Sequence, residues 1–340
     1  MHLAFAIFKY FPHGGLQSHM LRIAEAAAVR NHQVNIFTSA WEGKKPANPN
    51  IKIIILPLKC LTNWGKAAEF EKKFLQIIST ENFDLKVAFN RISGSDFYFA
   101  ADNCLLSLFN KPWSFLTKQL NPRYRVYLRQ EEGIFAENLH KPALLYIAET
   151  QKEAFIEAYN TAEKRFLYLP PGMNIACKRP DNAEQIRKKM RTELALSEEE
   201  LMLIQVGPLT TGKGCDRTIL ALAELPDKIK CKVKLFFAGG GKEKHLSALI
   251  NKNKLQGQVK FLGIRNDVPD LLQAADIMIH PARNEAAGSV LLEGIAAGVP
   301  VICSGECGFY TFVEEAAGLV TKKPFEQNEL NQLLLKTINK

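Results

Sequence analysis

Residues 276–304 read DIMIHPARNEAAGSVLLEGIAAGVPVICS, and this stretch decides the fold class. A short apolar run ends near Pro281, a helical pattern begins near Gly288, and a second apolar run starts at Val299. Strands joined by a helix pair in parallel, with the helix covering one face of the sheet. The stretch therefore predicts an α/β protein with a doubly wound parallel sheet.

The same alternation extends over most of the chain. The first half has predicted strands at 2–8, 33–38, 51–56, 84–89, 144–148 and 166–169, and predicted helices at 16–30 and 66–79. The second half has predicted strands at 201–207, 233–240, 258–263, 276–282 and 299–304. Two prolines and a glycine in LPPGMN, residues 169–174, predict a stiff link between the halves. We therefore expect two Rossmann-like domains, residues 1–170 and 171–340, facing each other across a cleft.

Composition narrows the class of protein. Apolar residues make up 47% of the 340 residues and charged residues 23%, which is ordinary for a folded globular protein. The net charge of +9 favours an anionic partner, either nucleic acid, a lipid surface or a phosphorylated substrate. Seven cysteines without a C-x-x-C pair suit reduced thiols in a cytoplasmic protein. No apolar run is long enough to predict a membrane span.

Several predicted strands end in glycine turns followed by helices. Gly14 and Gly15 follow the first strand, Lys213 stands between two glycines, and Gly239 begins a run of three. Free amides at a helix start can hold a phosphate, although a glycine after a strand is also ordinary turn chemistry. The chain has no complete G-x-G-x-x-G with a downstream acid, no G-x-x-x-x-G-K-[ST] and no D-x-D pair. We therefore expect no nicotinamide cofactor and no bound metal.

Two glutamates frame the helix in the opening stretch. Glu285 is expected in the loop before the helix, and Glu293 about one and a half turns into it. Carboxylates there can accept hydrogen bonds from the hydroxyls of two sugars, while the amides of Gly288, Ser289 and Val290 face a diphosphate between them. That arrangement suits a nucleotide sugar. The alternative is that both glutamates are simply solvated, and the residues alone leave this open.

These motifs together resemble a known family. The E-x7-E element, the two glycine turns and GIRNDVPDLLQAADIMIHPA resemble the retaining glycosyltransferases of the GT-B fold, family 4. Five segments are similar to those of family members that add glucose to the core of lipopolysaccharide. They are FKYFPHGGLQ, SAWEG, FYFAADNC, LPPGMN and NEAAGSVLLEGIAAGVPVI. The resemblance covers essentially the whole chain. It implies a UDP-sugar donor, UDP-glucose, an inner-core heptose acceptor and no nucleic acid.

The resemblance also implies residue roles. Gly15 approaches the donor phosphates, Lys213 pairs with the diphosphate and stabilises the leaving UDP, and Glu293 and Glu285 hold the ribose and the glucose. The further matched positions are the uracil-packing Ile264 and Arg265 and the acceptor-facing Asp102. No nucleophile is assigned, because the acceptor hydroxyl can attack from the face that the phosphate leaves.

Three departures from the family pattern weaken this expectation. Gly212 stands where the family has arginine beside the lysine, so half of a cationic clamp is missing or supplied from elsewhere. His19 stands where close relatives have aspartate, and it either contacts a substrate or caps a turn. The chain ends at LNQLLLKTINK, before the expected return of a last helix to the first domain. A silent module that binds a UDP-sugar or an anionic membrane, and a UDP-sugar epimerase, are therefore the rival hypotheses.

A basic and aromatic segment spans residues 105–130 and contains no acid. Its predicted membrane-binding residues are Lys111, Trp113, Lys118, Arg123, Arg125 and Arg129. This mixture suits the surface of an anionic bilayer, single-stranded nucleic acid, or an internal helical insertion with aromatic core residues. The family resemblance favours the first, on the cytoplasmic face of the inner membrane, because the acceptor is lipid-anchored.

Overall fold

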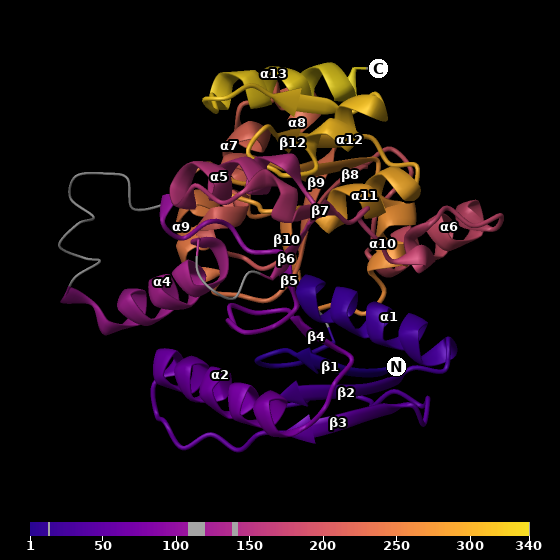
Figure 1. Cartoon of the computed structure of the whole chain (residues 1–340). Coiled ribbons are helices and arrows are strands. Elements are labelled where there is room, and N and C mark those ends of the chain that lie inside the picture. The colour runs from indigo at the N-terminus through magenta and orange to yellow at the C-terminus, as the bar shows by residue number, and fades with distance from the viewer. Residues whose placement is uncertain (13, 108–119, 138–141, 340) are drawn as a thin grey trace. The chain divides into compact units, whose positions relative to one another are not determined.

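The structure is a computed structural model that describes residues 1–339 except 13, 108–119 and 138–141 (Figure 1). The chain divides into two compact units, Met1–Pro170 and Pro171–Lys340. Each unit is built on one parallel sheet, with helices following most of the strands. The predicted α/β fold class is confirmed.

The first unit contains a seven-stranded sheet in the order β3-β2-β1-β4-β5-β6-β7. Its strands are β1 (His2–Ala6), β2 (Gln33–Thr38), β3 (Ile51–Ile55), β4 (Leu85–Ala88), β5 (Phe97–Ala100), β6 (Ala143–Tyr146) and β7 (Phe166–Tyr168). Its described α-helices are α1 (Gly15–Val29), α2 (Asn63–Thr80), α4 (Pro122–Phe135) and α5 (Glu149–Tyr159). Phe70 and Phe74 of α2 and Phe135 of α4 pack in one buried cluster with Ala4 and Ala6 of β1.

The second unit contains a six-stranded sheet in the order β10-β9-β8-β11-β12-β13. Its strands are β8 (Leu201–Val206), β9 (Val233–Ala238), β10 (Val259–Gly263), β11 (Ile277–His280), β12 (Val301–Ser304) and β13 (Leu319–Thr321). Its helices are α6 (Ala183–Glu193), α7 (Cys215–Ala223), α8 (Asp227–Lys230), α9 (Lys244–Lys252), α10 (Val268–Ala274), α11 (Ser289–Ala296), α12 (Tyr310–Glu315) and α13 (Gln327–Ile338). Ile219 and Leu222 of α7 and Leu330 and Leu334 of α13 share a buried cluster with the sheet.

Both sheets reverse their strand order beside their first strand. In the first unit β1 lies between β2 and β4, and in the second unit β8 lies between β9 and β11. Loops leave the carboxyl ends of such strands in opposite directions, and ligands of open parallel sheets bind in the crevice between them. The loops after β1, β4, β8 and β11 are therefore where a site is expected.

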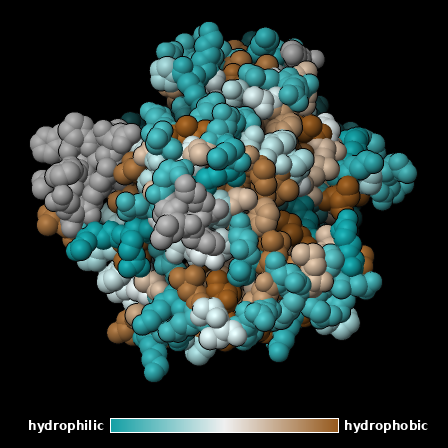
Figure 2. Space-filling view, viewed as in Figure 1, coloured by the Kyte–Doolittle hydropathy of each residue, from teal (hydrophilic) through white to brown (hydrophobic). Residues whose placement is uncertain are grey.

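Hydrophilic residues, drawn in teal, cover much of the face shown in Figure 2. Among the described residues, no helix is both long and apolar enough to cross a membrane.

Candidate active site

Lys213 and Glu285 meet at the strand reversal of the second unit. Lys213 ends a short 3-10 turn, Thr211–Lys213, after β8, and Glu285 lies in the loop after β11. The Nζ atom of Lys213 forms an ion pair with Oε2 of Glu285. The same oxygen lies 3.3 Å from Nε2 of His280, the last residue of β11. Two loops that are far apart in the sequence thus present one charged cluster at the carboxyl edge of the sheet.

The turn that carries Lys213 is fixed by its backbone. Gly214 adopts a left-handed conformation with φ of 68°, and a Cβ at this position would lie 2.0 Å from the carbonyl oxygen of Pro281. Any other residue would push the turn away from β11. Gln205 of β8 donates from Nε2 to the carbonyl oxygen of Lys213 at 2.7 Å, and Thr218 of α7 donates to Gln205.

Glu285 is held as an anion although it is largely buried. Burial raises the pKa of its carboxyl, but the hydrogen bond from His280 and the charge of Lys213 outweigh burial and lower the pKa to about 2. Because the carboxylate accepts, Nε2 of His280 carries the proton in this contact. His280 was not predicted as a site residue. The sequence signal that could have indicated His280 as a site residue is its position: it ends the buried strand IMIH and precedes a proline.

A helix N-terminus lies just beyond Glu285. Gly288, with φ of 93°, is the N-cap of α11, so the amides of Ser289 and Val290 open this helix without an intrahelical acceptor. Glu293 lies within the same helix and is half-buried. The predicted start of this helix near Gly288 is confirmed.

Two further loops of the second unit carry predicted donor-binding residues. Gly239 follows β9, where a Cβ would lie 1.9 Å from the carbonyl oxygen of Gly207, so the two turns pack backbone to backbone. Ile264 follows β10, is 65% exposed and lies against Gly240. Arg265 pairs with Asp267 through Nε at 2.7 Å and through Nη2. An exposed apolar side chain beside a glycine turn offers a surface on which a flat ring can pack.

Arg283 lies against the turn in which Gly212 stands. Its amide donates to the carbonyl oxygen of Gly212 at 2.7 Å, and its Nη1 donates to that of Thr211 at 2.8 Å. Its guanidinium also pairs with both carboxylate oxygens of Asp216, at 2.7 and 2.6 Å. The side chain thus ties the β11 loop to the Lys213 turn and adds a cation there.

The first unit places Gly14, Gly15 and His19 together after β1. Gly14 is the N-cap of α1 and Gly15 its first residue, with open space where a Cβ would be. His19 is buried inside α1, where it packs on Phe99 and accepts a hydrogen bond from Arg22 at 3.2 Å. Burial and the charge of Arg22 lower the pKa of His19 to about 4. His19 therefore lies within the helix and does not cap the turn.

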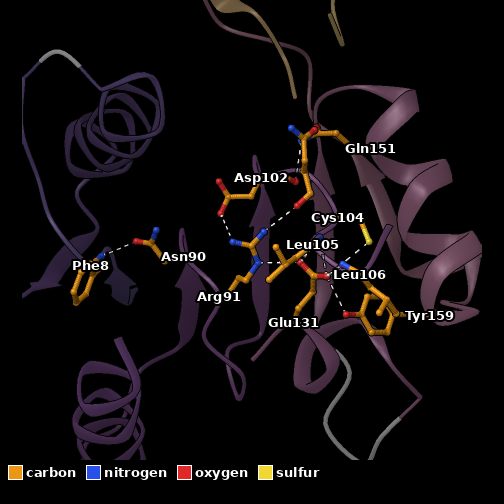
Figure 3. Close-up of polar contacts among 11 residues, drawn as sticks. Phe8, Asn90, Arg91, Asp102, Cys104, Leu105, Leu106, Glu131, Gln151 and Tyr159 are labelled. Atoms are coloured by element: carbon orange, nitrogen blue, oxygen red, sulfur yellow. Dashed lines mark hydrogen bonds and ion pairs between the residues drawn. The ribbon is translucent and has the colours of Figure 1, made fainter. Parts of the chain in front are cut away.

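Asp102 follows β5, at the same edge of the first sheet (Figure 3). Its Oδ2 accepts a hydrogen bond from Nη1 of Arg91 at 3.0 Å, and its side chain is 41% exposed. Close by, Asn90 accepts a hydrogen bond from the amide of Phe8 at 2.6 Å, which joins the loops after β1 and β4. Arg91 was not predicted from the sequence.

The structure describes only part of the predicted membrane-binding segment. Lys111, Trp113 and Lys118 lie outside the described residues. Three predicted arginines, Arg123, Arg125 and Arg129, are exposed on α4. A hollow of about 290 Å³ is lined by Trp64, Pro122, Arg125, Val126 and Arg129.

No group of three or more His, Cys, Asp or Glu side chains that could hold a metal ion occurs in the described part of the chain. Lys213 and Arg283 each bring a cation to the loops after β8 and β11.

Comparison with known proteins places this architecture. The family described as "Glycosyl transferases group 1" matches residues 186–340. Lipopolysaccharide glucosyltransferase WaaG of Escherichia coli (strain K12) is 37% identical over 339 residues, which cover 99% of this chain and 90% of that protein. The crystal structure of WaaG, a glycosyltransferase involved in lipopolysaccharide biosynthesis, superposes with a TM-score of 0.92 over the same shares.

A more distant structure has the same fold. Anabaena HepE in complex with UDP-glucose has a TM-score of 0.73 at 20% identity, covering 98% of this chain and 89% of that one. The fold and the 37% identity to WaaG over almost the whole chain define a glycosyltransferase with the GT-B fold. The chain belongs to the group 1 glycosyltransferase family.

Proposed function

We propose that this enzyme transfers glucose from UDP-glucose to an inner-core heptose of lipopolysaccharide, with retention of configuration. The observation that carries the proposal is the cluster of Lys213, Glu285 and His280 beside the N-terminus of α11. It supplies one cation, one sugar-binding carboxylate and the amides at the start of a helix within a single loop region, which suits a sugar joined to a diphosphate. The full-length similarity to a lipopolysaccharide glucosyltransferase supports the choice of donor and acceptor.

Different residues of the second unit bind the phosphates, the glucose, the ribose and the uracil of the donor. Lys213 has three N–H donors, so it can keep its contact with Glu285 and still reach a phosphate oxygen. Glu285 then accepts from a glucose hydroxyl and Glu293 from the ribose, while the amides of Ser289 and Val290 face the diphosphate. Gly239, in the turn that packs on Gly207, presents its backbone to the diphosphate, and Ile264 and Arg265 pack on the uracil. The lysine and the amides replace a metal in this scheme.

The first unit contributes the acceptor side. Asp102 accepts a hydrogen bond from the attacking hydroxyl, and Gly14, Gly15 and His19 contribute to holding the donor. The bond between C1 of glucose and the phosphate oxygen breaks, and the acceptor oxygen bonds to C1 on the same face. The hydroxyl proton passes to the departing phosphate oxygen. Lys213 and the α11 amides stabilise the charge that develops on UDP.

We also propose a peripheral location on the cytoplasmic face of the inner membrane. Arg123, Arg125 and Arg129 are exposed on α4, and each arginine near an anionic surface contributes about 1 kcal/mol. A lipid-anchored acceptor would then lie on the surface to which the enzyme binds.

Transfer onto purified truncated lipopolysaccharide, with a panel of UDP-sugars, tests the proposal. We expect glucose transfer from UDP-glucose, and faster transfer when the acceptor is presented in anionic vesicles than in neutral detergent micelles. Release of an altered sugar without acceptor would instead identify an epimerase. Donor binding without any transfer would identify a silent module, and equal rates in vesicles and micelles would remove the membrane location.

Arg283 is expected to replace the arginine that the family carries at position 212. Arg283→Met should lower kcat/KM for the donor about tenfold, because one charge-assisted contact is worth about 1.5–3 kcal/mol. Gly212→Arg should restore much of the loss, since a Cβ on Gly212 meets nothing closer than 3.8 Å. Arg179→Met removes a comparable exposed pair, with Glu184 at 2.6 Å, and is the matched control. Failure of Gly212→Arg to restore a folded Arg283→Met variant would contradict this role.

A further inference from the structure

One guanidinium of the first unit serves two carboxylates (Figure 3). Arg91 donates from Nη1 to Asp102 at 3.0 Å and from Nε to Glu131 of α4 at 2.9 Å. Its third contact is from Nη2 to the carbonyl oxygen of Asn103 at 2.9 Å. Burial alone would lower the pKa of Arg91, but Asp102 and Glu131 are among the groups that outweigh burial and raise it. Arg91 is thus a permanent cation fixed at three points.

Glu131 is the fixed end of this arrangement. Its side chain is fully buried, and its two oxygens accept several hydrogen bonds besides the one from Arg91. The other donors are the amides of Leu105 and Leu106 at 2.9 and 3.1 Å, the hydroxyl of Tyr159 at 2.9 Å and the thiol of Cys104 at 3.7 Å. A carboxylate held by so many donors from α5 and from the chain after β5 cannot turn without breaking several of them.

The loop that carries Arg91 is held at a second point. Glu71 of α2 is also buried, and its Oε1 accepts from both the amide and the hydroxyl of Ser93 at 3.0 Å. Its Oε2 accepts from Gln130 of α4 at 3.0 Å. Ser93 is thus held on one side of Arg91. On the other side, Asn90 accepts the hydrogen bond from the amide of Phe8, so the loop is held at both ends.

Exposure increases from the anchor to Asp102. The exposed fraction of the side chain is 0% for Glu131, 19% for Arg91 and 41% for Asp102. Gln151 of α5 additionally donates to the carbonyl oxygen of Asp102 at 3.3 Å. Within the described part of the chain, Oδ1 of Asp102 makes no hydrogen bond. One oxygen is thus occupied by Arg91, and the other is available to a ligand.

We propose that Arg91 and Glu131 are positioning residues for the acceptor. Glu131 fixes the guanidinium of Arg91, and Arg91 holds Oδ2 of Asp102 so that Oδ1 receives the attacking hydroxyl. This rests on the proposed function, in which Asp102 contacts the acceptor. A lysine in place of Arg91 keeps the charge but cannot bind both carboxylates and the carbonyl of Asn103 through a planar fork.

A double-mutant cycle tests this positioning role. Arg91→Lys is expected to lower kcat/KM for the acceptor about tenfold and to leave the Kd for UDP-glucose unchanged. In an Asp102→Asn background the same substitution should have no further effect, because residues that act as a unit are not additive. Arg165→Lys is the control: Arg165 is also buried, but it binds the carbonyl oxygens of Phe135 and Pro142 and should not couple to Asp102.

The outcomes separate this inference from the proposed function. Full activity of Asp102→Asn would remove Asp102 from the acceptor site and overturn this inference, while the proposed glucose transfer would stand; the proposed function fails only if the unmodified enzyme transfers no glucose. An impaired Asp102→Asn, with equal losses from Arg91→Lys in both backgrounds, would overturn the positioning role alone. Should Arg91→Lys not fold, Glu131→Gln completes the same cycle, since it keeps the shape of the anchor and removes its charge. Coupling of Glu131→Gln to Asp102→Asn supports the proposal, and additivity overturns it.

Discussion

Replacing Lys213 by alanine is expected to slow sugar transfer by on the order of a hundredfold or more. The ammonium group lies at the strand reversal, beside the α11 N-terminus, where the diphosphate is proposed to bind. Negative charge on that diphosphate grows as the bond to C1 breaks, so the loss should fall mainly on kcat. Initial rates at saturating UDP-glucose measure it. Lys213→Arg should retain more activity than Lys213→Ala, because it keeps the charge.

Lys188→Ala is the matched control for this substitution. Lys188 is an exposed lysine of α6 in the same unit, and its loss should leave kcat unchanged. A folded Lys213→Ala variant with the kcat of the unmodified enzyme would refute the role of Lys213 in stabilising the leaving group. A rise in the KM for the donor without a change in kcat would instead assign Lys213 to ground-state binding.

The sequence was a good guide to the sheets because buried parallel strands are short apolar runs with glycine or proline at their ends. The strands β2, β8 and β12 lie within one or two residues of their predicted bounds. The sequence did not predict β13 (Leu319–Thr321). Its apolar run was too short to stand out from the flanking sequence, unlike FLYL around β7, and the strand pairs in parallel with β12.

The site was predicted less completely, because ion pairs between distant loops leave no local pattern. Lys213 and Glu285 were each predicted as site residues, but the sequence did not indicate that they bind one another across 72 positions. Arg91 and Glu131 were missed because arginine and glutamate are usually solvated. Helical spacing was the available signal, since Glu131 lies three and four residues before the buried Ile134 and Phe135 and so shares their face.

Gly212 shows how a family pattern and a structure can differ without contradiction. The missing arginine predicted a weakened clamp, whereas Arg283 approaches the same turn from the neighbouring loop. Sequence patterns record positions along one segment, but a binding site requires only that a charge reaches a point in space. Function is therefore better argued from the assembled loops than from one motif.

Glu285→Gln is expected to lower transfer by on the order of a hundredfold or more, as for Lys213→Ala. The amide keeps the shape of the side chain but is neutral, so Lys213 loses its anionic partner and the sugar loses a strong acceptor. The rate of glucose transfer at saturating donor measures the effect. Glu306→Gln is the matched control, because Glu306 is a nearby glutamate whose pair with Lys323 is long, at 4.0 Å.

The same substitution has a second signature in acid. The folded pKa of Glu285 is about 2 against an ordinary 4.5, so its pairing stabilises the fold fully above about pH 4.5 and is lost as the pH falls toward 2. Over that window the unmodified protein should lose about 3 kcal/mol more of its unfolding free energy than Glu285→Gln does. Equal acid sensitivity of the two proteins, measured by urea unfolding at each pH, would mean that Lys213 and His280 do not hold this carboxylate in solution. A normal transfer rate in a variant that shows the expected acid behaviour would keep the ion pair and remove Glu285 from the reaction.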